Sequence, residues 1–216
     1  MIIPLFPLGV VLLPETFLPL HIFEERYKKM IGECLAENKE FGIVYFNGNE
    51  INKIGCCAQI VKLLKRYDDG EMDIITVGTK RFFIKELDET KACFQAKIVI
   101  FDDDPEEDTE ELKHLAASGI KLLKELKNVT GGEWDNTAFK DESDIKKMSF
   151  LISGNDGFTA DEKQKFLEMT STGKRLKQAV RALKKVIQRA RLNLEIEEII
   201  HGNGDAKKIM MTYDIK

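Results

Sequence analysis

The sequence predicts an α+β protein in which a small β barrel is followed by a helical bundle. Short apolar stretches separated by turn residues fill residues 1–104, as is typical of strands. In residues 105–200 the apolar residues recur every three or four positions, as is typical of helices packed on a core. We therefore expect a barrel subdomain over 1–104, a helical bundle ending in a long helix over 105–200, and a tail over 201–216.

The strand pattern occurs in five stretches of the first half. They are FGIVYF (41–46), IGCCAQIVKLL (54–64), EMDIITVG (71–78), RFFIKEL (81–87) and ACFQAKIVIF (92–101). Asp69 and Gly70 predict a tight hairpin turn, because glycine tolerates positive φ. Strands at this spacing favour a closed or nearly closed barrel. Four of the five prolines lie in the first nineteen residues, which predicts short edge strands and turns there.

Helical periodicity appears once in the first half and dominates the second. An apolar stripe that begins at Phe23 predicts a helix near 23–36, with Asn38 as a plausible stop. The second half predicts a helix over 112–123, a polar loop over 128–143, a short helix opened by a Thr159–Glu162 capping box, and a long helix over 173–200. HGNGD (201–205) is expected to end the long helix and to leave a weakly ordered tail.

An acidic run, FDDDPEEDTEE (101–111), separates the two patterns. Eight of its last ten residues are carboxylates, so mutual repulsion favours a solvated linker. Asp108, with Glu111 three residues later, fits a capping box that would start the next helix. The alternative is a divalent-cation site, but loops for hard cations alternate their carboxylates around a glycine, and this run has none.

The overall composition indicates an ordinary globular protein. The chain has 216 residues, 43% of them apolar, and a formal net charge of −4, which does not favour general nucleic-acid binding. The apolar opening, residues 1–20, lacks a basic start and is interrupted by prolines, so we expect neither a signal peptide nor a membrane span, and a cytoplasmic location. The four cysteines show no CxxC spacing and favour buried, reduced thiols over a metal or redox site.

One short stretch, LPLHIFEERY (18–27), raises the question of a chemical site. His21, Glu24 and Glu25 have a spacing that could place metal ligands or an acid–base pair on one helical face. A histidine-ligated metal usually needs a second histidine or cysteine nearby, and none is close in sequence. We therefore favour a structural role, in which Glu24 or Glu25 pairs with Arg26 or Lys28 and His21 is hydrogen-bonded at a strand-to-helix junction.

Three ordered motifs resemble those of the Lon N-terminal domain, also called the Lon substrate-binding domain. They are PLFPLGVVLLPETFLPLHIFEERYKKMI (4–31), VGTKRFFI (77–84) after the Asp69–Gly70 turn, and EKQKFLE (162–168) followed by RL (175–176). The resemblance implies a PUA-like pseudo-barrel followed by a helical bundle. The family signature positions, expected to be structural, are His21, Glu24, Arg26, Tyr27, Gly78, Arg81, Phe82, Gln164, Glu168, Arg175 and Leu176.

The resemblance also implies a function. In the full-length proteases this domain precedes an ATPase and a peptidase and helps to recognise unfolded or tagged polypeptides. Here the lone Gly173–Lys174 pair lacks the rest of a P-loop, and no GxSxG, HExxH or comparable catalytic motif occurs. We expect a non-enzymatic, stand-alone recognition module without a cofactor, which binds polypeptides in a groove between barrel and bundle. The alternative is an adaptor that presents clients to a separate AAA+ protease or chaperone.

A third hypothesis is RNA binding by the long helix. Its residues 174–191 include eight basic side chains and no acidic one: Lys174, Arg175, Lys177, Arg181, Lys184, Lys185, Arg189 and Arg191. A basic face can neutralise phosphates, but the stretch has no aromatic residue on which bases could stack. The competing interpretation, which we favour, is a solvated face attracted to the acidic run. Membrane binding is disfavoured, because the apolar face lacks Trp and Phe.

Overall fold

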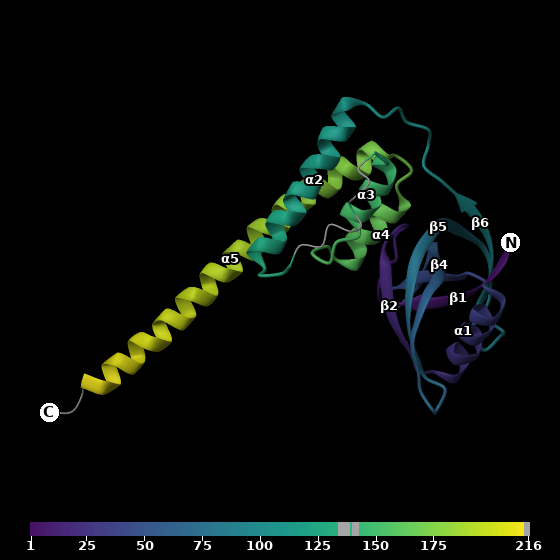
Figure 1. Ribbon diagram of the computed structural model, residues 1–216, viewed down its shortest axis with the longest axis horizontal. Helices are drawn as coiled ribbons and strands as arrows, with labels where there is room; N and C mark the ends of the chain where they lie inside the picture. Colours follow the sequence, from purple (N-terminus) through teal and green to yellow (C-terminus); the bar gives the residue numbers. More distant parts are fainter. Residues whose placement is uncertain (134–138, 140–142, 214–216) are drawn as a thin grey trace.

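The computed structural model describes residues 1–133, 139 and 143–213, with the backbone alone over 198–213. The strands are β1 (Ile2–Leu8), β2 (Phe17–Ile22), β3 (Phe41–Phe46), β4 (Ile51–Arg66), β5 (Met72–Asp88) and β6 (Gln95–Phe101). The helices are α1 (Glu25–Glu37), α2 (Glu110–Val129), α3 (Ile145–Ser153), α4 (Ala160–Glu168) and α5 (Thr172–Tyr213). The strands and α1 lie at one end, and α2 to α5 at the other, which confirms the predicted α+β class (Figure 1).

The sheet closes into a pseudo-barrel because β5 serves two sets of neighbours. The strand order is β2-β5-β4-β3-β1-β6, and β6 also pairs with β5. Met72–Val77 of β5 pair with β2, whereas Arg81–Asp88 pair with β6. On its other side β5 pairs with β4 from Met72 to Phe83. The two strands predicted over 71–78 and 81–87 are therefore one continuous strand, in which Gly78 still pairs with Ala58. β2 lies outside the closed ring, and its second edge pairs with no strand among the residues that the structure describes, so we call it the free edge.

β1 differs from the edge strand that its prolines predicted. It pairs in parallel with β3 over Leu5–Leu8 and antiparallel with β6 over Ile2–Pro4, so it lies inside the sheet. The two ladders use different halves of the strand. Pro4 therefore pairs with β6 only and Pro7 with β3 only. The missing N–H of each proline costs less there than in a central strand that is hydrogen-bonded on both sides.

The core consists of two clusters that divide at the barrel wall. A small cluster that includes Leu5, Phe82 and Ile98 fills the barrel, and a larger one continues from the outer barrel face and α1 into the helices. Cys56 belongs to the larger cluster and Cys57 to the smaller, as expected for neighbours on opposite faces of a strand. All four cysteines are free.

The helix ends follow local capping chemistry. α1 stops at Asn38, which has φ 50° in the left-handed region, as predicted. The predicted Thr159–Glu162 capping box opens α4. α2 begins differently from the expectation: Thr109, and not Asp108, is the N-cap, and its hydroxyl accepts a hydrogen bond from the Leu112 amide.

Two helical features were not predicted correctly. α3 was absent from the prediction, although Asp144 caps it and its side chains are largely buried. The backbone of α5 passes through 201–205 and continues to Tyr213, so the expected stop at Ile200 is wrong. Glycine lowers helix stability by about 1 kcal/mol relative to alanine but does not forbid a helix. Half of the predicted 128–143 loop, including the only tryptophan, lies outside the described residues.

Candidate functional site

The histidine of LPLHIFEERY is held by two carboxylates on β5 and the turn before it. His21 Nδ1 lies 2.7 Å from Asp73 Oδ1, and Nε2 lies 3.2 Å from Glu71 Oε2. The hydrogen bond to Asp73 is the main cause that raises the pKa of His21 above its usual value. In the described part of the chain, no three His, Cys, Asp or Glu side chains are placed to hold a metal. His21 therefore links β2 to β5 and to the residue before it through Asp73 and Glu71.

The rest of this motif anchors α1. The Arg26 side chain donates to Glu24, with 2.9 Å between Nε and Oε2. Tyr27 is buried and stacks on Phe6 at 4.0 Å between ring centroids. Lys28 pairs with Glu25 at 2.9 Å. Glu24 thus pairs with Arg26, and Glu25 with Lys28, within the set of pairings that the sequence predicted.

A buried charge network joins the barrel to the helices. Asp103 lies between Arg81 of β5 and Arg175 of α5, and the three side chains are 5%, 1% and 0% exposed. Arg175 donates to Asp103 Oδ1 at 2.5 Å and to Oδ2 at 2.9 Å, and Arg81 donates to Oδ1. Backbone carbonyls of Leu167 and Met169 at the end of α4 accept further bonds from these guanidinium groups.

The expectation of a solvated acidic linker is wrong for Asp103, whose side chain is buried, whereas the other carboxylates of 102–111 are exposed. Asp103 is buried, Asp104 Oδ2 accepts a bond from the Thr170 hydroxyl at 2.8 Å, and Glu106 accepts one from the Gly173 amide at 2.9 Å. The carboxylates thus gather at the positive N-terminal end of α5 and beside buried arginines, where attraction exceeds their mutual repulsion.

The other signature positions of the helical and barrel halves meet near the same junction. Gln164 of α4 donates to the Ile54 carbonyl of β4 at 3.1 Å and to Glu168 at 2.9 Å. Phe82 and Leu176 are fully buried. Gly78 exchanges backbone hydrogen bonds with the segment before β2, and a Cβ there would lie 2.1 Å from the Leu13 carbonyl oxygen.

The basic face predicted on the long helix is partly used inside the protein. Arg175 is buried in the network and is unavailable to a nucleic acid, which removes it from the proposed set. Lys177 pairs with Glu111 at 2.9 Å and Arg191 with Glu125 at 2.8 Å, both on α2. The remaining five basic residues of the set are exposed.

The groove predicted between barrel and bundle is small, and charged as well as apolar side chains line it. A cavity of about 330 Å³ lies there, lined by residues that include Glu15, Asp102, Lys146 and Lys147. Lys146 pairs with Asp102 at 2.5 Å and Lys147 with Glu15 at 3.6 Å across it. This groove offers little apolar surface to a polypeptide.

Several exposed apolar side chains lie instead on β2, just after it, and on β4, which β5 separates from β2. Phe17 is 62% exposed and Phe23 58%, and alternation along the strand places both on one face. On β4, Val61 and Leu64 lie at two bulges opposite β5 and are about half exposed. We call these four residues the β2 patch. Phe23, expected to begin the α1 stripe, precedes the helix and stacks beside His21.

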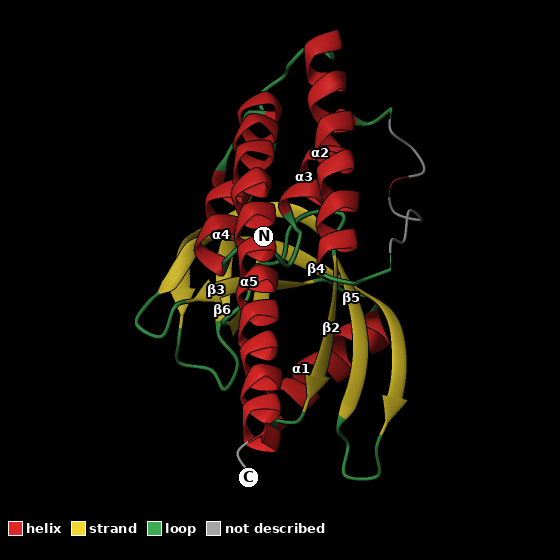
Figure 2. Cartoon of the chain, turned by 90° about the vertical axis from the view of Figure 1, so that its left-hand side faces the viewer, coloured by secondary structure: helices red, strands yellow, loops and turns green. Residues whose placement is uncertain are grey.

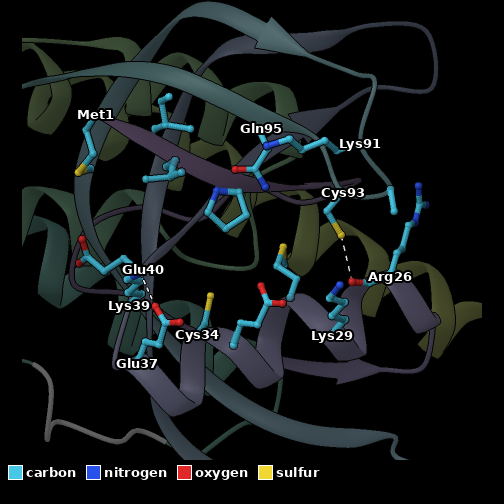
Figure 3. Close-up of a pocket in the computed structure, with 16 residues that line it drawn as sticks. Met1, Arg26, Lys29, Cys34, Glu37, Lys39, Glu40, Lys91, Cys93 and Gln95 are labelled. Carbon is cyan, nitrogen blue, oxygen red and sulfur yellow. Dashed lines mark hydrogen bonds and ion pairs between the residues drawn. The ribbon is translucent and has the colours of Figure 1, made fainter.

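A second concave surface lies between α1, the start of β1 and residues 91–95 (Figure 3). We call this cavity of about 740 Å³ the α1 pocket. Its apolar lining includes Ile3, Pro4, Met30, Cys34 and Cys93. Charged side chains complete the lining: Arg26, Lys29, Glu33, Glu37, Lys39, Glu40 and Lys91. Sequence reasoning missed both surfaces, because exposed and buried apolar residues look alike in a single sequence.

Comparison with known proteins decides the family. The model of the ATP-dependent protease La (LON) substrate-binding domain matches residues 2–185. The chain belongs to this LON substrate-binding domain family. The Lon protease of Flavobacterium johnsoniae is 27% identical over an alignment that covers 95% of this chain and 27% of that protein. The Lon protease of Cytophaga hutchinsonii is 25% identical, and the alignment covers 96% of this chain and 27% of that protein. The chain thus spans about a quarter of the length of the curated Lon proteases it matches.

Solved structures of LON domains share the fold. A Lon N-terminal domain protein from Xanthomonas campestris superposes with a TM-score of 0.66 at 19% identity, covering 82% of this chain and 96% of that one. The N-terminal domain of a Mycobacterium avium complex Lon protease gives 0.61 at 18% identity, covering 85% and 98%. Among the described residues, no helix has both the length and the hydrophobicity of a membrane span.

Proposed function

We propose that this LON domain is a non-catalytic recognition module that binds unfolded polypeptide segments along β2. The observation that carries the proposal is a strand paired on one side only, with Phe17 and Phe23 exposed beside its free edge. An edge strand presents unpaired N–H and C=O groups, to which an extended segment can add as a further strand. The family supports a role in substrate recognition.

Two features of the β2 patch suit weak, sequence-tolerant binding. Main-chain hydrogen bonds do not depend on the side chains of the bound segment, and the aromatic rings offer apolar contact to many residues. Pro19 lies in the middle of β2 and removes one donor from the strand. A proline on an edge strand limits uncontrolled edge-to-edge pairing, so the free edge is retained without inviting aggregation.

Fluorescence anisotropy of a labelled, permanently unfolded polypeptide tests the proposal. We expect saturable binding with weak salt dependence, and about tenfold weaker binding by a Phe17→Ser, Phe23→Ser double variant, because each exposed ring contributes apolar contact. Phe83→Ser is the matched control, since Phe83 is 40% exposed on the other half of β5.

Three outcomes would contradict the proposal. They are no saturable binding by the folded protein, equal loss in the control variant, or binding of labelled RNA alone that collapses as salt is raised. The last outcome would move the function to the exposed basic residues of α5.

A further inference from the structure

The α1 pocket has an ordered distribution of charge. Arg26, Lys29, Glu33 and Glu37 all line it and follow one another along α1 at intervals of three or four residues, so they share one helical face. The two basic residues come first along the helix and the two acidic residues last. The pocket therefore has a cationic end and an acidic end.

This order is the reverse of what helix stability favours. Acidic side chains stabilise the N-terminal end of a helix and basic ones the C-terminal end. The last turn of α1 contains no basic residue. On the pocket face, the charges of Arg26 and Lys29 add to the positive end of the macrodipole, and that of Glu37 adds to the negative end. A field of this kind is suited to a dipolar ligand.

Other charged groups also line the pocket: Lys91 lies opposite α1, and the amino terminus of Met1 and Lys39 lie on the side of Glu37. Figure 3 shows Lys91 extending above the end of the pocket that holds Arg26 and Lys29, whereas Glu40 lies with Glu37 at the other end. In the part of the chain that the structure describes, Lys29 and Lys91 have no ion pair; Arg26 pairs with Glu24, and Lys39 with Glu37. The cationic end therefore has two ammonium groups without an ion pair, one of which, Lys91, interacts electrostatically with Asp88.

The apolar floor and the length of the pocket define the rest of the ligand. Ile3, Pro4, Met30 and Cys34 lie between the two charged ends. Eleven residues of helix separate Arg26 from Glu37, which corresponds to about 16 Å at about 1.5 Å per residue. An extended peptide covers that distance with about five residues.

We propose that the α1 pocket binds the carboxyl-terminal residues of a polypeptide. The free carboxylate lies between Lys29 and Lys91, apolar side chains contact the floor, and a basic side chain about four residues earlier faces Glu37 and Glu40. This assignment rests on the proposed polypeptide-binding function and names a second, end-specific site for it. A small amphipathic acid such as a fatty acid shares the carboxylate and the apolar part but lacks the basic group.

The test uses a fluorescein-labelled peptide that ends in Lys-Ala-Leu-Val-Leu with a free carboxylate, and its carboxyl-amidated twin. We expect amidation to weaken binding to the wild-type protein about tenfold, since it removes a charge that faces two ammonium groups. In a Lys29→Gln, Lys91→Gln double variant the effect of amidation should fall below about threefold. Lys85→Gln, an exposed lysine on β5 outside the pocket, should leave the tenfold effect unchanged.

Three results would overturn the assignment. They are equal binding of the two peptides, an amidation effect that persists in the double variant, or displacement of the labelled peptide by decanoate at concentrations similar to those of unlabelled peptide. The last would mark a fatty-acid site. A third peptide, with glutamate in place of its lysine, should bind more weakly than the first, and tighter binding would reverse the proposed orientation.

The two proposals can fail separately. Loss of the amidation effect, with binding of the unfolded polypeptide still dependent on Phe17, would remove only the end-specific site. An amidation effect that depends on Lys29, without any contribution from Phe17 or Phe23, would remove only the β2 patch.

Discussion

Removal of the Asp103 carboxylate should destabilise the protein more than any other single change to an acidic residue of 102–111. Asp103→Ala leaves the Arg175 guanidinium, 0% exposed, without its counter-charge, and leaves Arg81, 1% exposed, with only the more distant Asp102 carboxylate at 4.0 Å. The same carboxylate also accepts a bond from the Thr172 hydroxyl at 2.5 Å. Burial already lowers the pKa of Arg81 from its usual value, and Asp103 opposes that effect.

The magnitude follows from the number of charges left unpaired. Breaking a buried ion pair by removing one partner costs about 3–5 kcal/mol of stability. Because one carboxylate here pairs with two arginines, we expect the free energy of unfolding to fall by about 5 kcal/mol. Carbonyl acceptors and the Phe150 ring, 3.8 Å from the Arg175 Cζ, keep the loss from being larger. The free energy of unfolding of a natural domain is about 5–15 kcal/mol, so the variant should be barely stable at 25 °C.

Urea unfolding followed by circular dichroism measures the effect. Asp102→Ala is the matched control, because that neighbouring carboxylate is 69% exposed, its contact with Arg81 is long at 4.0 Å, and its pair with Lys146 should be worth less than about 1 kcal/mol. Asp103→Asn keeps an acceptor oxygen but not the charge and should fall between the two. A loss below about 1 kcal/mol for Asp103→Ala, at an unchanged m-value, would refute the assignment of the network as the main polar link between barrel and helices.

Three further changes test other parts of the structure. The hydrogen bond to Asp73 raises the pKa of His21, so its stabilisation is complete below the unfolded value of about 6.5 and is lost as pH rises through the folded value. The destabilisation caused by His21→Gln in urea unfolding should therefore be larger at pH 5.5 than at pH 8.5; equal values would contradict the pair. Gly78→Ala places a Cβ 2.1 Å from the Leu13 carbonyl oxygen and should cost about 3 kcal/mol by thermal unfolding, whereas an unchanged melting temperature would mean that the close approach is wrong. Among the cysteines, Cys93 alone is partly exposed, so mass spectrometry after brief alkylation of the folded protein should find it modified first, and modification of a buried thiol at the same rate would argue against the packing.

Local patterns predicted much of the fold because local physics determines those features. The strands, the Asn38 stop and the Thr159 capping box depend on alternation and capping within a few residues of each other. β1 and Asp103 depend on partners distant in sequence. A proline-rich strand becomes internal only because β3 and β6 each bond a different half of it, and a carboxylate becomes buried only because two arginines converge on it. No single-sequence pattern distinguishes Asp103 from its exposed neighbours.

The candidate surfaces were beyond prediction for a related reason. Phe17 and Phe23 lie in an apolar stretch that could equally belong to a core, and their exposure follows from the place of β2 at the end of the sheet. Lys29 and Lys91 lie far apart in the chain and share a pocket only after α1 packs beside β1. By contrast, the resemblance to a known family marked Arg81 and Arg175 from the sequence, and the structure adds what they contact.

The length of α5 has a consequence for anything joined to its far end. Arg191 forms an ion pair with Glu125 of α2. Beyond it the helix continues for 22 residues to Tyr213, which corresponds to about 33 Å (Figures 1 and 2). Its near end is fixed by Arg175 within the buried network. A partner attached beyond Tyr213 would thus be held at a set distance and direction from the β2 patch and the α1 pocket, as by a rigid spacer. A polypeptide segment bound at either surface, as proposed, would have to bridge that gap before the partner could reach it.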